Sequence, residues 1–362
     1  METTASPTID TPLAALHRAA NARPGVWFGC ALPDDFGDWR AEYSFARKTV
    51  ALVDKNYRAH LSFTGPDRAR YLNAILTSDV TNLAQNHGTV SLLLNPQGRI
   101  LAEVETYALR EHLFCVSYAM IHERLIAWMD KYIIMDDVTL TDDSKQFATL
   151  ALEGRLAAEV VQQVSGIALG GMVELELREA SVGIVPCRVI KRSPGGIAGA
   201  EFVASRASIE TLWNLLSEAV RSHDGGAMGY TALNCLRLEQ GIPWFGYDFG
   251  EKQIPHEAGL QDSHISYTKG CYTGQEIVER VRSRGQTNRM RVLMKFAGTA
   301  PESGTLLLAE EKEIGTVTRT GFSPELQINI GMGYVRREKS TVGSELAHAG
   351  GRATVIEAPL QS

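Results

Sequence analysis

The sequence predicts an α+β fold with two related α+β halves followed by a small all-β module. In the first half, alternating apolar residues predict strands, and longer periodic stretches at 67–76 and 121–132 predict helices. The order of strand, glycine turn and helix returns at 147–153, 154–155 and 156–164, which indicates an internal structural duplication. After Gly285 the pattern changes to short apolar runs separated by Gly and Ser, which is typical of a small β-barrel.

The individual elements follow from their local sequence. Gly65-Pro66-Asp67 turns the chain into the first helix, and 95–99 (NPQGR) has the composition of a tight hairpin turn. Strands are predicted in order at 49–53, 59–64, 89–94, 100–109, 113–118, 147–153, 183–190 and 201–204, with a further helix at 209–220. In the last part, strands are predicted at 292–296, 304–308, 313–320, 331–335 and 353–357.

These patterns divide the 362 residues into four predicted parts. Residues 1–26 are small and polar around a weakly amphipathic piece, and we expect them to form a loose N-terminal extension. We expect a first α+β domain at 27–145, a second at 146–285 and a β-barrel at 286–362.

Composition narrows the class of protein. The chain is 44% hydrophobic and 22% charged, as in ordinary globular proteins, and its net charge of -6 favours no stable binding to nucleic acid. No apolar run is long enough to cross a bilayer, and the N-terminus lacks the pattern of a targeting signal. Five cysteines without a Cys-x-x-Cys pair argue against a disulfide framework and against a metal site built by the protein. A reducing, cytoplasmic location is expected.

The segment 269–276 (KGCYTGQE) carries the strongest chemical signal. Thr273 and Glu276 have the spacing of a capping box, so a helix is predicted from about Gly274 to Gly285. Cys271 comes just before this helix, where the peptide dipoles and Lys269 favour a thiolate. The alternative is an inert, buried cysteine, which is the interpretation we prefer for Cys115, Cys187 and Cys235 because apolar strand or helix residues surround them.

A glycine- and aromatic-rich loop at 241–248 follows Arg237 and includes Trp244. Such a loop suits a flat heterocycle flanked by an arginine that binds a carboxylate. It equally suits a plug between domains, and composition does not separate the two.

At these residues the chain resembles a known family. Its 269–276 segment matches the signature of the YgfZ family at every fixed position, and 237–241 (RLEQG) resembles the Arg-Leu-Glu-x-Gly of the larger glycine-cleavage T-protein superfamily. The resemblance covers about 49–357. It implies a three-domain, cloverleaf-like T-protein fold, a tetrahydrofolate ligand, and a role with client or assembly proteins in iron–sulfur cluster assembly or repair, through a transient cluster, with a link to tRNA modification.

The resemblance also assigns site residues. Cys271 and Lys269 are expected to be catalytic, supported by the motif residues Gly270, Tyr272, Gly274, Gln275 and Glu276. Folate contacts are expected from Arg237, Tyr107, Glu103, Asn95 and Trp244.

Two departures from the T-protein pattern affect the expected activity. Ala102-Glu103 stands where the T-protein has paired aspartates, and 194–197 (PGGI) replaces its pterin-binding Tyr-Thr-Gly-Glu. We therefore expect altered folate recognition and no ordinary aminomethyltransferase activity. The first hypothesis is a folate-binding iron–sulfur accessory protein that uses Cys271. The second is a folate-dependent one-carbon transferase on a small amine that uses Glu103, and the third is a binding scaffold without chemistry.

Overall fold

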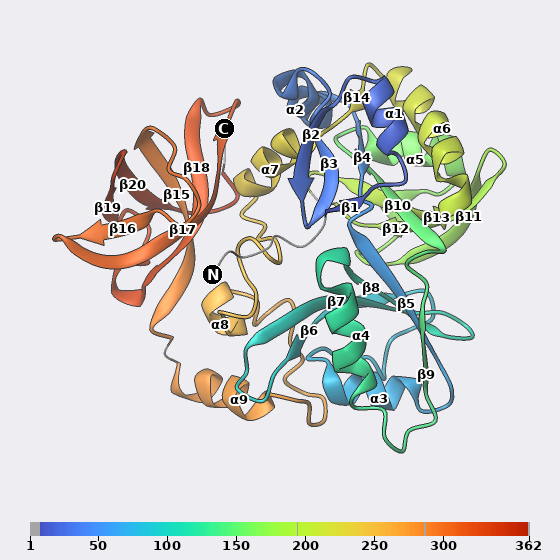
Figure 1. The fold of residues 1–362 in the computed structure, drawn as a ribbon, viewed down its shortest axis with the longest axis horizontal. Coiled ribbons are helices and arrows are strands. Elements are labelled where there is room, and N and C mark those ends of the chain that lie inside the picture. Colours follow the sequence, from blue (N-terminus) through green and yellow to red (C-terminus); the bar gives the residue numbers. More distant parts are fainter. Residues whose placement is uncertain (1–7, 194, 286, 361–362) are drawn as a thin grey trace. The chain divides into compact units, whose positions relative to one another are not determined.

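The computed structural model describes residues 8–193, 195–285 and 287–360, which form two compact units (Figure 1). Unit 1 contains residues 8–72, 80–89 and 104–233, and unit 2 contains residues 73–79, 90–103 and 234–360. The chain therefore alternates between the units, and no single cut in the sequence separates them.

A six-stranded sheet forms the larger core of unit 1. Its strand order is β11-β12-β13-β10-β4-β14. The strands are β4 (Ala51–Asp54), β10 (Phe147–Glu153), β11 (Leu177–Val182), β12 (Val185–Lys191), β13 (Gly199–Ser205) and β14 (Gly226–Ala227). Helices α5 (Ala157–Ser165) and α6 (Ile209–Arg221) pack their apolar sides on this sheet. Because β4 pairs with β10, a domain boundary at residue 145 would divide one sheet.

A second sheet has the order β6-β7-β8-β5-β9. Its strands are β5 (Arg58–Thr64), β6 (Gly88–Leu94), β7 (Ile100–Ala108), β8 (Leu113–Tyr118) and β9 (Thr139–Asp142). Helices α3 (Arg68–Ile75) and α4 (His122–Asp130) are connected by the Tyr71 hydroxyl, which donates to the Met129 carbonyl. The predicted hairpin between β6 and β7 is confirmed, because Asn95 Oδ1 accepts the backbone N–H groups of Gln97 and Arg99.

The N-terminal region is packed rather than loose. It forms β1 (Ile9–Asp10), α1 (Ala14–Ala19), β2 (Arg23–Trp27) and β3 (Cys30–Asp35), followed by α2 (Trp39–Lys48). Leu13 is fully buried, and Thr11 Oγ1 and His17 Nε2 lie 2.6 and 2.8 Å from Asp54 Oδ2. The expectation of a loose extension is therefore wrong for residues 8–26, because one buried aspartate fixes two of its side chains; residues 1–7 lie outside the described residues.

The C-terminal part of unit 2 is a closed barrel with the strand order β15-β18-β17-β16-β19-β20. Its strands are β15 (Arg289–Gly298), β16 (Leu306–Ala309), β17 (Lys312–Ser323), β18 (Ile328–Arg336), β19 (Glu345–His348) and β20 (Gly351–Ile356). Its interior contains Met294, Leu307, Val317 and Val335. The predicted fold class, two α+β parts and a C-terminal barrel, is confirmed.

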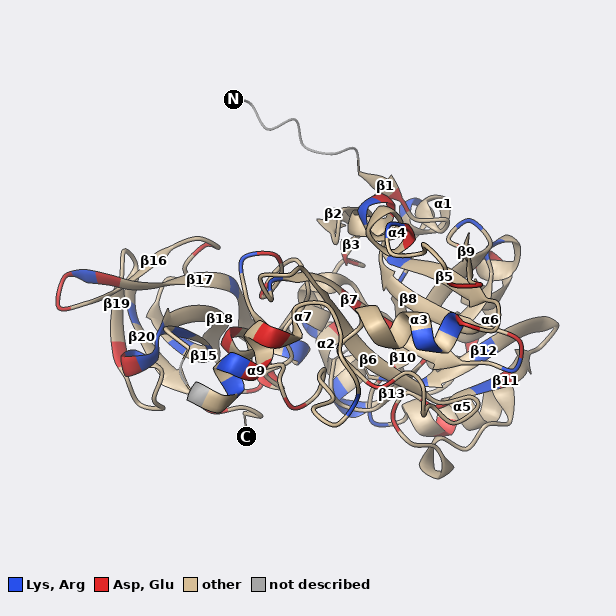
Figure 2. Ribbon diagram, turned by 90° about the horizontal axis from the view of Figure 1, so that it is seen from below, with Lys and Arg blue, Asp and Glu red and all other residues tan. Residues whose placement is uncertain are grey.

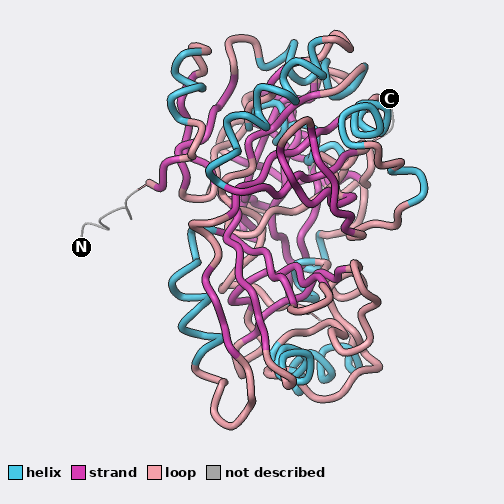
Figure 3. Tube along the Cα trace, turned by 90° about the vertical axis from the view of Figure 1, so that its right-hand side faces the viewer, coloured by secondary structure: helices cyan, strands magenta, loops and turns pink. Residues whose placement is uncertain are grey.

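The segment before the barrel contains α7 (Tyr230–Glu239), α8 (Pro255–Ala258) and α9 (Gln275–Arg284). Charged residues of both signs lie along α9 (Figure 2). Arg280 forms an ion pair with Glu276, and Arg282 forms one with Glu279. Short 3₁₀ turns lie at Ala119–Ile121, Leu169–Gly171, Arg206–Ser208 and Arg337–Lys339. The helices, drawn in cyan in Figure 3, are short. Within the described ranges, none is long and apolar enough to cross a membrane.

Candidate active site

Three polar side chains share one face of strand β7. Glu103, Glu105 and Tyr107 are spaced two residues apart, and side chains on a strand alternate between its two faces. All three are buried, and the Tyr107 hydroxyl donates to Glu105 Oε2 at 2.7 Å. A buried carboxylate is costly unless it is paired. The partners of each glutamate therefore determine what this face can do.

Glu103 is paired with a histidine. Its Oε1 lies 3.0 Å from Nε2 of His264, and both side chains are about nine-tenths buried. On the other side of the ring, Nδ1 lies 2.7 Å from Ser263 Oγ. The His264 carbonyl accepts hydrogen bonds from Thr77 Oγ1 at 2.5 Å and Ser78 Oγ at 2.9 Å. These contacts fix the imidazole, and the imidazole in turn orients the carboxylate.

Glu105 belongs to a buried cluster of charges in unit 1. Its Oε1 accepts from Arg58 Nη2 at 2.9 Å and from Arg192 Nε at 2.8 Å. Arg58 also donates to Glu201 at 3.1 Å, and Glu201 accepts from Lys55 as well. Three cations thus surround two carboxylates, and Lys55, Arg58, Glu105 and Glu201 are almost entirely removed from solvent.

The cluster holds the Glu201 carboxylate in the ionised form. Burial alone would raise the pKa of Glu201, but Arg58 and Lys55 lower it well below its usual range. Burial lowers the pKa of Lys55 to about 8, an effect that Arg58 reinforces and Glu201 opposes. Burial and Glu105 raise the pKa of Tyr107, so its hydroxyl keeps the proton that it donates. The cluster is a fixed electrostatic unit.

Glu153 ends β10 with a fully buried carboxylate. Its Oε1 accepts from Ser193 Oγ at 2.7 Å and from the Ile197 N–H at 3.1 Å. Among the described residues, Oε2 has no hydrogen-bond partner. Burial raises the pKa of Glu153 to about 7, although the hydrogen bonds from Ser193 and Ile197 oppose the rise. A Cβ at Gly195 would lie 2.7 Å from Oε1, so a larger residue there would require the Glu153 carboxylate to move.

Lys269 connects backbone segments within unit 2. Its ammonium donates to the carbonyls of Asn73, Leu76 and Ser78, with lengths of 2.6 and 2.9 Å to Asn73 and Ser78. An ammonium has three donors, and all three are used. Burial lowers its pKa to about 8. The structure therefore gives Lys269 a structural role, and its predicted action on Cys271 stays a prediction.

The predicted helix after Cys271 is confirmed as α9, which ends at Gly285 in the left-handed conformation. The predicted capping box is wrong. The N-cap is Gly274 with a φ of 82°, no side chain caps the helix, and Glu276 pairs with Arg280 instead. A Cβ at Gly274 would lie 2.6 Å from the Asn95 carbonyl oxygen, so the close approach of the backbone selects glycine over a capping side chain.

The cysteines differ in exposure, and the burial expected for Cys115, Cys187 and Cys235 is confirmed. Cys271 is exposed, whereas Cys30, Cys115, Cys187 and Cys235 are buried. Burial raises the pKa of Cys115 to about 12, which suits an inert packing residue. Within the described ranges, no group of three or more His, Cys, Asp or Glu side chains is arranged to hold a metal ion.

Arg237 is completely buried and paired with Asp248. Its Nε and Nη2 donate to Asn234 Oδ1 at 3.0 and 2.8 Å, and Nη1 also donates to the Ile242 carbonyl at 3.1 Å. The guanidinium carbon lies 4.6 Å from the centre of the Trp244 ring. Arg237 and Trp244 thus come together as predicted, but their contacts are within the protein.

Several residues of these clusters were not found from the sequence, namely Lys55, Arg58, Glu105, Glu153, Arg192, Glu201 and His264. Most of the acids and bases among them occupy strand positions inside apolar runs. Charged residues are rarely buried without a partner. A charge at an inward strand position was therefore a usable signal, although it does not indicate which partner each charge contacts.

Comparison with known proteins places the chain in a family. Residues 13–264 match the GCVT N-terminal domain, and residues 289–360 match the glycine cleavage T-protein C-terminal barrel domain. The chain belongs to the glycine cleavage T-protein family. It is 26% identical to an aminomethyltransferase of Caldanaerobacter subterraneus subsp. tengcongensis, over 93% of this chain and 90% of the relative. It is 27% identical to that of Halalkalibacterium halodurans, over 93% and 92%.

A solved structure shares the fold. The glycine cleavage system aminomethyltransferase T from Bartonella henselae superposes with a TM-score of 0.88 at 23% identity, covering 97% of both chains. This agreement is between folds, and it includes the two α+β parts and the barrel.

These relatives correct the first functional hypothesis. They are aminomethyltransferases, so the interpretation as an iron–sulfur accessory protein is wrong, as is the expectation of no aminomethyltransferase activity. The relatives give no support to iron–sulfur client partners or to a transient cluster. The narrower YgfZ assignment has no support among them. The physical reason for the error is that neither departure in the sequence removes the buried carboxylate from its part of the structure. A buried carboxylate remains beside Ala102, in Glu103, and another contacts the 194–197 segment, in Glu153.

Proposed function

We propose that this protein is a folate-dependent aminomethyltransferase that transfers a one-carbon unit from a small aminomethyl donor. Membership of the glycine cleavage T-protein family and relatives named aminomethyltransferase support the reaction class. The observation that carries the proposal is the buried Glu103–His264 pair, with 3.0 Å between Oε1 and Nε2. It supplies an oriented carboxylate next to Ala102, at the position where the resemblance places the acid.

The residues present fit tetrahydrofolate at one testable point. The donor edge of a pterin, its amino group and ring N–H, requires a buried acceptor, and Oε2 of Glu153 is a buried acceptor without a partner among the described residues. A buried acceptor left unpaired costs about 1–3 kcal/mol, which a bound donor recovers. We assign this edge to Glu153. When bound, tetrahydrofolate accepts the one-carbon unit.

The other folate contacts remain predictions. The Tyr107 hydroxyl donates a hydrogen bond to Glu105. Arg237 forms an ion pair with Asp248 and donates hydrogen bonds to Asn234. Asn95 uses its side-chain oxygen to close the hairpin. These three residues therefore support neighbouring structure, and any contact with folate has to be made by atoms outside these bonds.

The chemical role of Glu103 follows from charge. The nitrogen of an aminomethyl donor becomes cationic as it leaves, and a preorganised carboxylate stabilises developing positive charge. Burial strengthens the attraction because the local dielectric constant is lower than that of water. His264 holds Oε1 in place, so the carboxylate does not need to reorganise during transfer.

The test compares wild type with Glu103→Gln. Glutamine keeps the shape but removes the charge, so we expect kcat to fall by about 10²-fold or more while the fold is retained. The measurement is tetrahydrofolate-dependent ammonia release from a panel of small aminomethyl donors.

Glu111→Gln is the matched control, because Glu111 is 82% exposed and outside the site. Equal rates for wild type and Glu103→Gln would reject the assigned role. No turnover by the wild type with any donor of the panel would reject the proposed reaction.

A further inference from the structure

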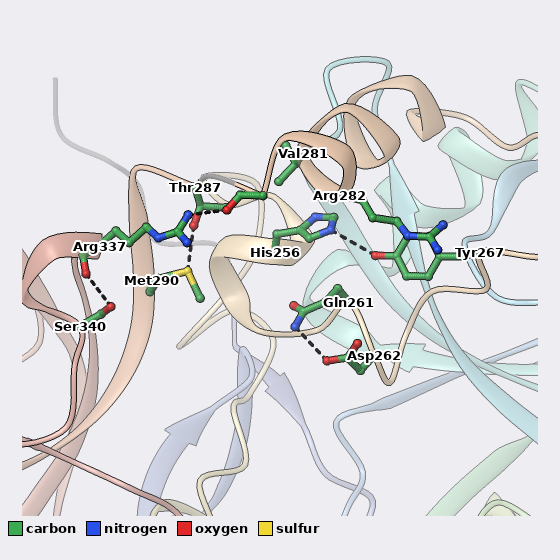
Figure 4. A pocket seen from close by; sticks show the side chains of 11 residues that line it. His256, Gln261, Asp262, Tyr267, Val281, Arg282, Thr287, Met290, Arg337 and Ser340 are labelled. Carbon is green, nitrogen blue, oxygen red and sulfur yellow. Dashed lines mark hydrogen bonds between the residues drawn. The ribbon is translucent and has the colours of Figure 1, made fainter.

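Unit 2 contains a cavity whose lining includes neither Glu103 nor His264. Its volume is about 390 Å³, and residues between α8 and the barrel line it (Figure 4). Its polar and charged lining residues include His256, Gln261, Asp262, Tyr267, Arg282 and Arg337. Figure 4 shows Arg337 and Arg282 on opposite sides of His256, with Gln261 on the wall beside it.

Two buried polar atoms of this wall have no partner within the described ranges, Nδ1 of His256 and Oε1 of Gln261. The orientation of the Gln261 amide is defined, because its Nε2 donates to Asp262 Oδ2 at 3.0 Å. The orphan atom is therefore the carbonyl oxygen, which requires a donor. Buried polar atoms in native proteins are generally paired, so two such atoms without partners, on residues that line one cavity, need an explanation.

The histidine is held in place from its other nitrogen. Nε2 of His256 lies 3.1 Å from the Tyr267 hydroxyl. Burial lowers the pKa of His256, although the carboxylates of Asp262 and Glu279 oppose this shift. The ring is therefore neutral at pH 7. We assign the Tyr267 hydroxyl as the donor to Nε2, which places the hydrogen of the neutral ring on Nδ1. That hydrogen has no acceptor among the described residues and requires one.

Two guanidinium groups supply positive charge. Arg282 stacks on Tyr267, with 4.1 Å from its guanidinium carbon to the ring centre, and pairs with Glu279 at 3.5 Å. Arg337 donates to the Gly285 carbonyl and keeps further donors. Arginine binds carboxylates with two parallel hydrogen bonds, so each end of the cavity suits one carboxylate.

We propose that this cavity binds a free amino dicarboxylate of the size of L-glutamate. One carboxylate pairs with Arg337 and the other with Arg282, the ammonium donates to Gln261 Oε1, and His256 Nδ1 donates to a carboxylate oxygen. The chain thereby gains a site for a small amino acid that is separate from Glu103 and His264.

The test is calorimetric titration of the whole protein, without folate, with L-glutamate and with glutarate, which lacks the ammonium. We expect one site for L-glutamate, with about tenfold weaker binding for glutarate and for Gln261→Leu, and at least tenfold weaker binding for Arg337→Met. Arg336→Met is the matched control, because Arg336 is exposed and outside the cavity lining. Arg282→Met provides a second variant if Arg337→Met unfolds.

Several outcomes would overturn the site. If the cavity holds only ordered water, titration with up to about 10 mM L-glutamate gives no heat of binding. That result would reject the proposed site. Equal affinity for glutarate would reject the ammonium contact. Tighter binding of N-(4-aminobenzoyl)-L-glutamate than of L-glutamate would show that a folate tail, and not a free amino acid, is the ligand. None of these results bears on the transfer activity, so the two proposals fail independently.

Discussion

Glu105 and Glu103 stand two residues apart on one face of β7, yet their neighbours differ in kind. Glu105 is surrounded by the permanent cations Arg58 and Arg192 and by the Tyr107 hydroxyl. Glu103 pairs with the imidazole ring of His264. Permanent partners fix a carboxylate as part of the fold, whereas an imidazole leaves it able to respond to a reacting group.

Glu153 extends the comparison to a third setting. Its partners are neutral, a hydroxyl and a backbone N–H, and its second oxygen is unpaired among the described residues. Glu105 thus accepts hydrogen bonds from two positively charged side chains, whereas the hydrogen-bond donors to Glu153 carry no charge. Substitutions of Glu105, Glu153 and His264 test the three settings in turn.

The largest effect is expected for Glu105→Gln. The change leaves Lys55, Arg58 and Arg192 with Glu201 as the one remaining carboxylate of the buried cluster, so we expect the free energy of unfolding to fall by about 3–5 kcal/mol. Urea denaturation at pH 7 measures it. Glu276→Gln is the control, because Glu276 is 83% exposed and forms one pair on a helix surface, worth about 0.5 kcal/mol or less. A loss for Glu105→Gln as small as that of the control would show that the cluster does not stabilise the fold.

A smaller effect, dependent on pH, is expected at Glu153. Its pKa is raised from 4.5 to about 7, so the folded state binds the proton more tightly than the unfolded state. Stability from this group is complete below pH 4.5 and is lost as the pH rises through about 7, on the order of 3 kcal/mol in total.

Denaturation curves of wild type and Glu153→Gln between pH 4.5 and 8 test this expectation. The stability difference should move in favour of the variant as the pH rises, because glutamine cannot ionise. A difference that stays constant over this range would mean that the Glu153 carboxyl titrates at its ordinary pKa.

The smallest effect is expected for His264, which acts through Glu103. His264→Leu removes one hydrogen bond to the carboxylate, so we expect kcat to fall about tenfold with KM unchanged. His264→Gln retains a side-chain N–H donor and should recover most of the rate. If both variants have the same rate while their free energies of unfolding equal that of the wild type, His264 does not position Glu103.

The sequence predicts the fold well and the site only in part. Strands 113–118 and 147–153 coincide with β8 and β10 because each is a short, mostly apolar run whose residues are buried at nearly every position. The capping box at Thr273 fails because the distance from Gly274 to the Asn95 carbonyl is a tertiary contact. The pairing of Glu103 with His264 is likewise invisible in one dimension, since the residues are 161 positions apart.

The most conspicuous motif illustrates the same limit. Lys269 beside Cys271 indicates an activated thiol, but three backbone carbonyls occupy the lysine. Adjacency in sequence therefore does not establish adjacency of side-chain atoms. Burial and partner atoms decide it, and these come from segments that the local pattern does not include.

The division of unit 2 along the chain has a consequence for biosynthesis. Residues 73–79 and 90–103 leave the ribosome long before residues 234–360, with which they form a compact body. The Thr77 hydroxyl, for example, has no His264 carbonyl to bind until translation is well advanced. These early segments stay incompletely packed during synthesis, when nascent apolar surface attracts chaperones. Fragments that end before the barrel are expected to retain this defect.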